Sequence, residues 1–191
     1  QEMILGIGGM RALQAVGLQP TVCHMNEGHA AFLSLERIRQ FVEARGCDHR
    51  VARQALVAAN VFTTHTPVPA GFELFPAPLL ERYLGGFASA VNLPFNEFLA
   101  MGRMGADNPS EPFNMAVLAM GNSNHVNGVS KLHAKVSRSM FHGRWAKYPE
   151  DEVPIDPVTN GIHTPTWTSR RMAELFDKYL DGDWRRNGAD P

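Results

Sequence analysis

A cluster of polar side chains follows a short apolar segment near the start of the sequence, in residues 21–33, TVCHMNEGHAAFL. It contains two imidazoles, an amide and a carboxylate, which belong to His24, Asn26, Glu27 and His29. These groups can hydrogen-bond the hydroxyls of a ligand, transfer protons or coordinate a metal ion. The cluster therefore predicts a binding site, and a polar ligand is the favoured occupant.

Two other interpretations of this cluster stay open. A metal site would combine Glu27 and His29 with His24 and His65. These residues span the end of a strand and the start of a helix, where the ligand spacing of a single helix does not apply. In a purely structural interpretation, Asn26 or Glu27 caps the following helix and His24 bonds within the protein.

Apolar periodicity and turn residues predict alternating strands and helices along the chain. Strands are expected at residues 21–25, 60–64, 125–129 and 156–160. Helices are expected at residues 2–17, 30–44, 51–58, 77–84, 96–101, 114–120, 131–141 and 169–180, with a loop at 102–112. Such intervals are typical of βαβ units, so the pattern predicts an α/β fold with a mostly parallel sheet.

Polar residues recur at the ends of the predicted strands, as Glu27 and His29, His65, Asn127, and Asn160. Because ligands of parallel α/β sheets bind outside the carboxyl ends of the strands, these side chains are expected to line one groove. The alternatives are a solvated loop histidine at His65 and a plain turn at Asn160.

Glycines at positions 6, 8 and 9 lack the preceding strand of a dinucleotide-binding loop, so we expect them to let helices pack closely. The apolar face of the same helix is predicted to comprise Ile4, Leu5, Met10, Leu13 and Val16. The charged residues at 181–186 are expected to form a solvated surface.

Composition narrows the class of protein. With 191 residues, 44% of them hydrophobic, the chain can bury a sizeable core. A net charge of −1 argues against a nucleic-acid surface, and no apolar run is long enough to cross a membrane. Two cysteines, Cys23 and Cys47, indicate a reducing cytoplasm. Because the sequence begins inside a predicted helix without a methionine, we expect a fragment.

Five motifs occur in order along the chain: QEMILGIGGMRAL, HMNEGHAAFLSLERIR, TTHTPVPAGFE, SNHVNGVSKLHAKVSR and TNGIHTPTW. Together they resemble the α-glucan (glycogen, starch and maltodextrin) phosphorylases, particularly the bacterial branch. The related family stretches read NDTHP, NHTVLPE, SHAVNGVARIH and TNGITPRRW. The resemblance implies that residues 1–191 are the later part of the amino-terminal, glucan-binding domain of a GT-B-type glycosyltransferase, whose two Rossmann-like, doubly wound domains enclose a cleft.

The resemblance also implies an activity for the full-length enzyme. Inorganic phosphate would attack the terminal glucose of an α-1,4-glucan and release glucose 1-phosphate. The family uses pyridoxal phosphate, carried by a lysine of the carboxyl-terminal domain, which this chain lacks. We therefore expect the isolated chain to be inactive and to bind no cofactor. A homodimer is compatible with the resemblance.

Carried over motif by motif, the resemblance assigns roles to single residues. His65 would be catalytic and substrate-binding, with its main-chain carbonyl near the developing positive charge and its ring toward the primary hydroxyl of the reacting sugar. Asn160 would bind hydroxyls of that sugar. Glu27 and His29 would face the acceptor side of the cleft. Trp167, seven residues after Asn160, matches a tryptophan that packs near the cofactor.

Two departures from the family motifs leave questions open. Ala70 stands where many relatives have a glutamate, so the role of the nearby Glu73 is undecided. The segment HTPTW, which begins at His163, lacks both arginines of TPRRW. Two rival functions also remain. One is a nucleotide-sugar-dependent glucan synthase of the same architecture, and the other is a non-catalytic carbohydrate-binding fragment.

Overall fold

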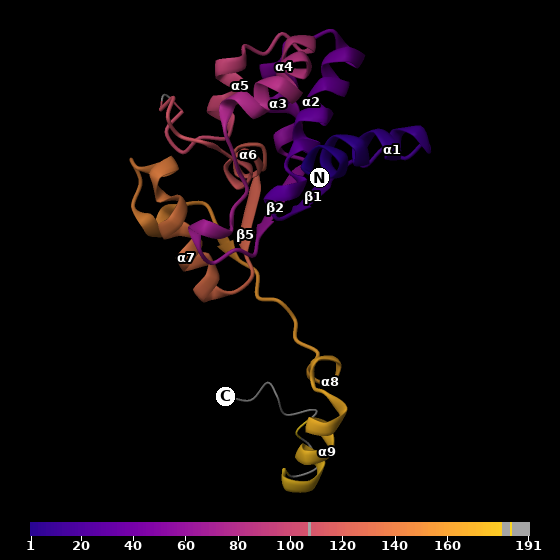
Figure 1. The fold of residues 1–191 in the computed structure, drawn as a ribbon, viewed down its shortest axis with the longest axis vertical. Coiled ribbons are helices and arrows are strands. Elements are labelled where there is room, and N and C mark those ends of the chain that lie inside the picture. Colours follow the sequence, from indigo (N-terminus) through magenta and orange to yellow (C-terminus); the bar gives the residue numbers. More distant parts are fainter. Residues whose placement is uncertain (107, 181–183, 185–191) are drawn as a thin grey trace. The chain divides into compact units, whose positions relative to one another are not determined.

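The computed structural model describes residues 1–106, 108–180 and 184, which fall into two units (Figure 1). Gln1–Thr159 form the first unit, which contains the sheets. The second unit, Asn160–Pro191, contains helices α8 (Thr164–Trp167) and α9 (Arg170–Tyr179). Ser169 caps α9 because its hydroxyl accepts a hydrogen bond from the Met172 amide.

The main sheet is parallel throughout. Its strands are β1 (Cys23–Asn26), β2 (Asn60–Thr64), β5 (His125–Gly128) and β6 (Asp156–Pro157), in the spatial order β1-β2-β5-β6. This arrangement confirms the predicted α/β class and parallel sheet. The fourth strand is shorter than predicted, since it ends at Pro157 and not at residue 160.

A second, antiparallel pair of strands was not predicted. It joins β3 (Leu74–Phe75) to β4 (Phe113–Asn114), with Leu74 opposite Asn114. Each strand has only two residues, which is too short to produce an alternating sequence pattern.

Helices alternate with the strands of the first unit as predicted. They are α1 (Gly9–Ala15), α2 (Phe32–Arg45), α3 (His49–Val57), α4 (Ala77–Ala90), α5 (Phe95–Met101), α6 (Met115–Gly121) and α7 (Lys131–Phe141). Short 3₁₀ turns lie at Gly28–Ala30, Pro69–Gly71, His142–Trp145 and Glu150–Glu152. Among the described residues of 102–112 there is no helix or strand, as expected for a loop.

Local signals set several helix ends. Helix α2 stops at Gly46, whose φ of 62° is a left-handed conformation that glycine adopts without strain. Helix α7 starts after Ser130, whose hydroxyl accepts a hydrogen bond from the His133 amide. The predicted Ser130 cap is therefore confirmed.

The two faces of the parallel sheet differ in chemistry. Parallel strands that follow one another in chain order, joined by right-handed crossovers, carry their helices on one face. The row formed by Met25, Phe62 and Val126 is buried on that face, together with the apolar residues of α6. The opposite face carries polar side chains, including His24 and Thr63.

The start of the chain differs from the expected amphipathic helix. Residues Ile4–Gly8 form a π-helix, whose wider turn shifts the phase of the residues around it. Gly6, Ile7 and Met10 are the buried residues of this segment. The predicted apolar face is wrong for three of its members, because Ile4, Leu5 and Val16 are 79%, 53% and 71% exposed.

Close helix packing is confirmed for one glycine of the GIGG segment. A Cβ atom on Gly6 would lie 2.7 Å from the Leu33 amide nitrogen and 2.9 Å from the Phe32 carbonyl carbon, so this position tolerates only glycine without movement of α2. Gly9 is different, because a Cβ there would meet nothing within 4 Å.

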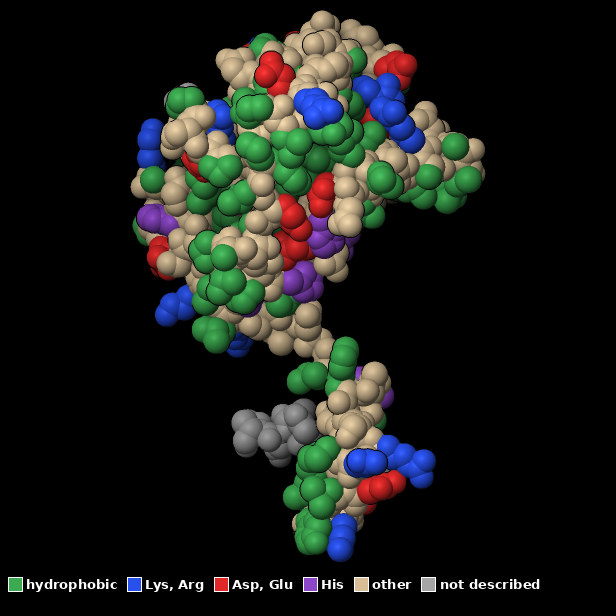
Figure 2. All heavy atoms as spheres, in the orientation of Figure 1, with side chains coloured by type: hydrophobic (Ala, Val, Ile, Leu, Met, Phe, Trp, Pro, Cys, Tyr) green, Lys and Arg blue, Asp and Glu red, His purple; other side chains and the backbone are tan. Residues whose placement is uncertain are grey.

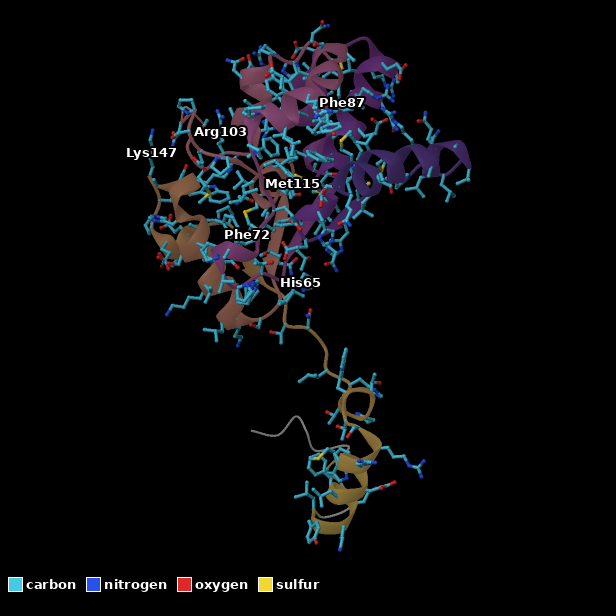
Figure 3. The ribbon with its side chains drawn as sticks, in the orientation of Figure 1. His65, Phe72, Phe87, Arg103, Met115 and Lys147 are labelled. Atoms are coloured by element: carbon cyan, nitrogen blue, oxygen red, sulfur yellow. The ribbon has the colours of Figure 1, made fainter. Side chains whose placement is uncertain are left out.

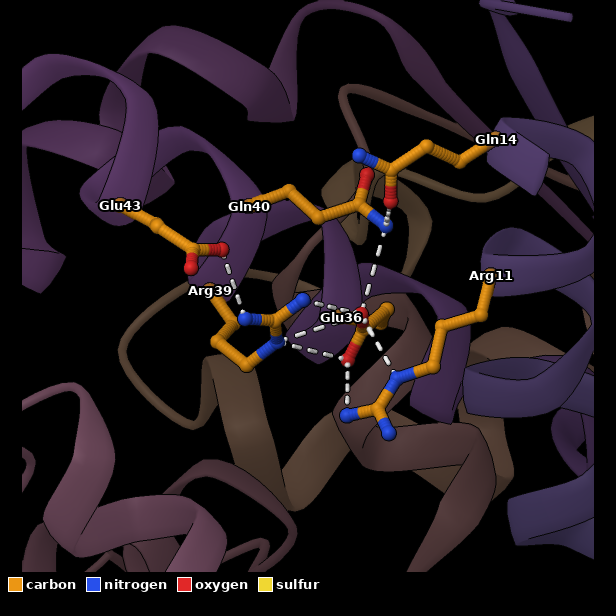
Figure 4. Close-up of polar contacts among 6 residues, drawn as sticks. All are labelled: Arg11, Gln14, Glu36, Arg39, Gln40 and Glu43. Carbon is orange, nitrogen blue, oxygen red and sulfur yellow. Dashed lines mark hydrogen bonds and ion pairs between the residues drawn. The ribbon is translucent and has the colours of Figure 1, made fainter. Parts of the chain in front are cut away.

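A buried carboxylate joins α1 to α2 (Figure 4). Glu36 of α2 is fully buried and accepts hydrogen bonds from Arg11 of α1 at 3.0 and 3.1 Å, from Arg39 at 2.8 to 3.2 Å and from Gln40 at 3.3 Å. Burial alone would raise the pKa of the Glu36 carboxyl. The hydrogen bonds and charges of Arg39 and Arg11 outweigh burial and lower this pKa below its ordinary value.

Within the described ranges, no helix combines the length and apolar character needed to cross a membrane. The predicted solvated surface at residues 181–186 lies outside the described residues, apart from Trp184.

Candidate functional site

Glu27 directly follows β1 in a backbone conformation that is rare for any residue except glycine. Its φ is 69° and its ψ is 168°. Such conformations cost about 1–3 kcal/mol and persist only where surrounding contacts hold them. Here the Glu27 amide still donates to the Thr63 carbonyl at 2.9 Å, which extends the β1–β2 pairing by one residue.

The carboxylate of Glu27 bridges the ends of β1 and β2. Its Oε2 atom accepts hydrogen bonds from the His65 amide at 2.7 Å, the Thr66 amide at 3.0 Å and the Thr66 hydroxyl at 2.9 Å. Its Oε1 atom accepts a bond from the Gly28 amide at 3.2 Å, which caps the following 3₁₀ turn. The proposed capping role of Glu27 is thus confirmed, and the carboxylate also anchors a segment 38 residues further along the chain.

His65 directly follows β2, and its side chain is exposed (Figure 3). The preceding Thr64 is fully buried, and Pro67 follows two residues later. Between Thr64 and Pro67, the amide of His65 donates a hydrogen bond to the Glu27 carboxylate. The structure therefore brings two of the predicted site residues together.

His29 meets a residue whose role the sequence left undecided. Its Nδ1 atom lies 3.9 Å from Oε1 of Glu73, and the two side chains are 45% and 34% exposed. Both line a small pocket of about 210 Å³ together with Gln1, Glu2 and Leu5. Figure 2 shows acidic and histidine side chains side by side on this part of the first unit. Glu73 therefore lines the same pocket as His29. Strand β3, which begins directly after Glu73, had not been predicted.

A row of hydrogen bonds crosses the polar face of the sheet. His24 Nε2 lies 2.7 Å from the Thr63 hydroxyl, which donates to Asn127 Oδ1 at 2.7 Å. Because the parallel register places these residues on adjacent strands, the interaction needs the sheet to form. The internal hydrogen bond expected for His24 is confirmed, and the sequence signal for the row was only the alternation of each strand.

The remaining predicted site residues belong to the second unit. Asn160 is its first residue, and Trp167 ends α8 with 82% of its surface exposed. In that unit His163 Nδ1 lies 2.6 Å from the Thr166 hydroxyl. The roles of Asn160 and Trp167 stay predictions.

The metal interpretation finds no support in the described part of the chain. No group of three or more histidine, cysteine, aspartate or glutamate side chains there could hold a metal ion. The carboxylate of Glu27 is directed at backbone amides, and His24 is engaged with Thr63.

Similarity to known proteins identifies the family. A sequence model of the carbohydrate phosphorylases matches residues 15–190. The chain belongs to the carbohydrate phosphorylase family. This match confirms the resemblance inferred from the five motifs, and β1, β2 and the Glu27–His65 contact all lie within the matched residues.

Individual phosphorylases match almost the whole chain. Maltodextrin phosphorylase of Thermococcus litoralis is 43% identical over 185 residues, which are 97% of this chain and 21% of that protein. Glycogen phosphorylase of Mycobacterium tuberculosis is 44% identical over 194 residues, covering 96% of this chain and 22% of that protein. Glycogen phosphorylase of Aquifex aeolicus is 31% identical and is covered to 25%. The chain thus spans about a fifth of the length of the first two relatives.

The lysines of this chain do not fit a covalently held pyridoxal phosphate. A lysine that carries such a cofactor needs an amine shielded from water and held in a pocket. The sequence has four lysines, all exposed at the surface, at positions 131, 135, 147 and 178. None of these four lysines therefore fits as the carrier of a covalently held pyridoxal phosphate.

Proposed function

We propose that the full-length protein containing this chain is an α-glucan phosphorylase and that this chain supplies part of its glucan-binding domain. Inorganic phosphate replaces the glycosidic oxygen at the anomeric carbon of the terminal glucose. The products are glucose 1-phosphate and a glucan shortened by one residue. The observation that carries this proposal is the contact between Glu27 and the His65 amide in a member of the phosphorylase family.

The proposed contribution of this chain is binding and charge stabilisation. His65 presents its main-chain carbonyl to the positive charge that develops on the reacting sugar, and its ring binds the primary hydroxyl. His29 and Glu73, which share one pocket, bind hydroxyls on the acceptor side. Asn160 binds the same sugar as His65, and Trp167 contacts the cofactor. The roles of His65, His29, Asn160 and Trp167 rest on the family motifs, and that of Glu73 rests on the pocket it shares with His29.

The rest of the enzyme supplies what this chain lacks. We assign pyridoxal phosphate and its lysine to the carboxyl-terminal domain of a GT-B architecture, because the lysines found here are exposed. Inorganic phosphate would bind in the same domain. The isolated chain would then be inactive. We also propose a cytoplasmic location, because both cysteines are unpaired. A homodimer is proposed on the basis of the family resemblance.

The test is phosphate-dependent release of glucose 1-phosphate from maltoheptaose by the full-length protein. We expect release that rises with phosphate concentration and stops when phosphate is left out. Strict dependence on a nucleotide sugar would instead identify a glucan synthase. Tight calorimetric binding of maltodextrin by residues 1–191 alone would favour a non-catalytic carbohydrate-binding role, because half of a cleft should bind weakly.

A further inference from the structure

The hydrogen bonds of Glu27 leave its Oε2 atom with no capacity for a substrate. A carboxylate oxygen has two lone pairs, and Oε2 already receives three donors from His65 and Thr66 at 2.7 to 3.0 Å. The Oε1 atom accepts one bond, from the Gly28 amide at 3.2 Å, so three of the four donors to this carboxylate are backbone amides. The main partner of the Glu27 carboxylate is therefore the protein backbone.

The bond to the Thr66 amide has a geometric consequence for His65. The carbonyl group of His65 and the amide of Thr66 belong to one peptide unit, which is planar and trans. In a trans peptide the N–H and C=O groups point in opposite directions. The Thr66 nitrogen lies 3.0 Å from Oε2 of Glu27, so its N–H points toward the Glu27 carboxylate. The His65 carbonyl therefore points away from that carboxylate.

The strained backbone of Glu27 supports the same conclusion. Its φ of 69° is costly for a residue other than glycine, so the contacts of the Glu27 side chain must hold this conformation. The carboxylate reaches across from β1 to the end of β2 and fixes both amides that flank the His65 carbonyl. Buried Thr64 before this segment and Pro67 after it limit the remaining freedom.

We infer that Glu27 is a positioning residue that orients the main-chain carbonyl of His65. This inference rests on the proposed phosphorylase function, because that function assigns the His65 carbonyl to the reacting sugar. Loss of the positioning bond lowers turnover more than it lowers affinity, since the carbonyl matters most when positive charge develops.

The experiment compares four variants of the full-length enzyme with the wild type. Glu27→Gln replaces the charge-assisted acceptor, Glu27→Asp keeps the charge on a shorter side chain, and Thr66→Val removes the hydroxyl donor to the same oxygen. Glu81→Gln, an exposed carboxylate on α4, is the matched control. The measurements are kcat and KM for phosphorolysis of maltoheptaose, and hydrogen exchange of the amides at 65 and 66.

For Glu27→Gln we expect kcat to fall about 10- to 100-fold while KM for maltoheptaose changes less than about 3-fold. The amides at 65 and 66 should exchange faster. Glu27→Asp should recover part of the lost kcat, and Thr66→Val should shift both readouts in the same direction by less. If Glu27→Gln fails to fold, Thr66→Val carries the test. Glu81→Gln should match the wild type.

Two results would overturn the positioning role. One is unchanged exchange at 65 and 66 in both Glu27→Gln and Thr66→Val. The other is a KM that rises more than about 10-fold at constant kcat, which would identify Glu27 as a glucan ligand. Hydrogen exchange does not depend on turnover. A full-length protein without phosphorolysis would therefore refute the proposed function, while the exchange data would still decide whether Glu27 holds this segment.

Discussion

The buried carboxylate of Glu36 allows a quantitative prediction about how α1 is held on α2 (Figure 4). Glu36→Gln keeps the size of the side chain but removes the charge that Arg11 and Arg39 bind. Removing one partner of a fully buried ion pair costs about 3–5 kcal/mol. The side chains of Arg11 and Arg39 are 53% and 22% exposed, so water can solvate them again after the substitution. We therefore expect a smaller cost of about 2–3 kcal/mol.

Hydrogen exchange of the α1 amides in the full-length protein measures this cost locally. If the free energy of detaching α1 falls by about 2–3 kcal/mol, its amides should exchange about 30- to 160-fold faster. Glu43→Gln is the matched control, because Glu43 contacts the same Arg39 from a 72% exposed position. Its effect should be at most about 0.5 kcal/mol. Equal exchange rates in the two variants would refute the reasoning.

The same carboxylate predicts a pH dependence. Although burial opposes it, Arg39 and Arg11 lower the pKa of Glu36, so the folded state binds its proton less readily than the unfolded state. The stabilisation is complete above the ordinary glutamate pKa and is lost as the pH falls through the lowered value. Protection of α1, corrected for intrinsic exchange, should decrease in that acidic range in the wild type and stay level in Glu36→Gln.

Two further predictions concern the packing of the chain start and the proposed catalytic histidine. Gly6→Ala should destabilise the protein by about 1–3 kcal/mol, because the new Cβ would lie 2.7 Å from the Leu33 amide nitrogen. Gly9→Ala, which meets nothing within 4 Å, should leave thermal stability unchanged or raise it, so equal losses would contradict this view. His65→Ala should lower kcat/KM of the full-length enzyme about 2- to 13-fold, the value of one sugar hydrogen bond of about 0.5–1.5 kcal/mol. An unchanged kcat/KM would show that the His65 ring does not bind the sugar.

Elements with strong local signals were predicted well. Strand β2 and helix α7 have the predicted bounds, because apolar content, the Ser130 cap and neighbouring turns act within a few residues. Strand β6 was predicted too long, and the β3–β4 pair was missed. Strands of two residues form only by pairing with a partner strand, so they leave no local sequence pattern. The phase of the first helix was wrong because a π-helix has no clear sequence signature.

The sequence predicted which residues belong to the site, but not which hydrogen bonds join them. The motifs identified Glu27, His29 and His65 as polar groups at strand ends, and the structure places Glu27 against the His65 amide. That the Glu27 carboxylate serves the backbone could not be inferred, because the bond joins residues 38 positions apart and depends on the β1–β2 register. The contact of His29 with Glu73 likewise needed the loop that follows β2.

The sequence alone determined the family, the α/β class, most helices and the residue types at the strand ends. Each of these is encoded over short stretches, in motif order, apolar periodicity and capping residues. Only the tertiary structure decided which polar groups meet, since Glu27 reaches the Thr66 amide only when the pairing of β1 with β2 brings their ends within about 3 Å. It also decided that Glu27 holds the peptide unit of His65 and Thr66, because the direction of a side chain depends on the backbone conformation at its own position.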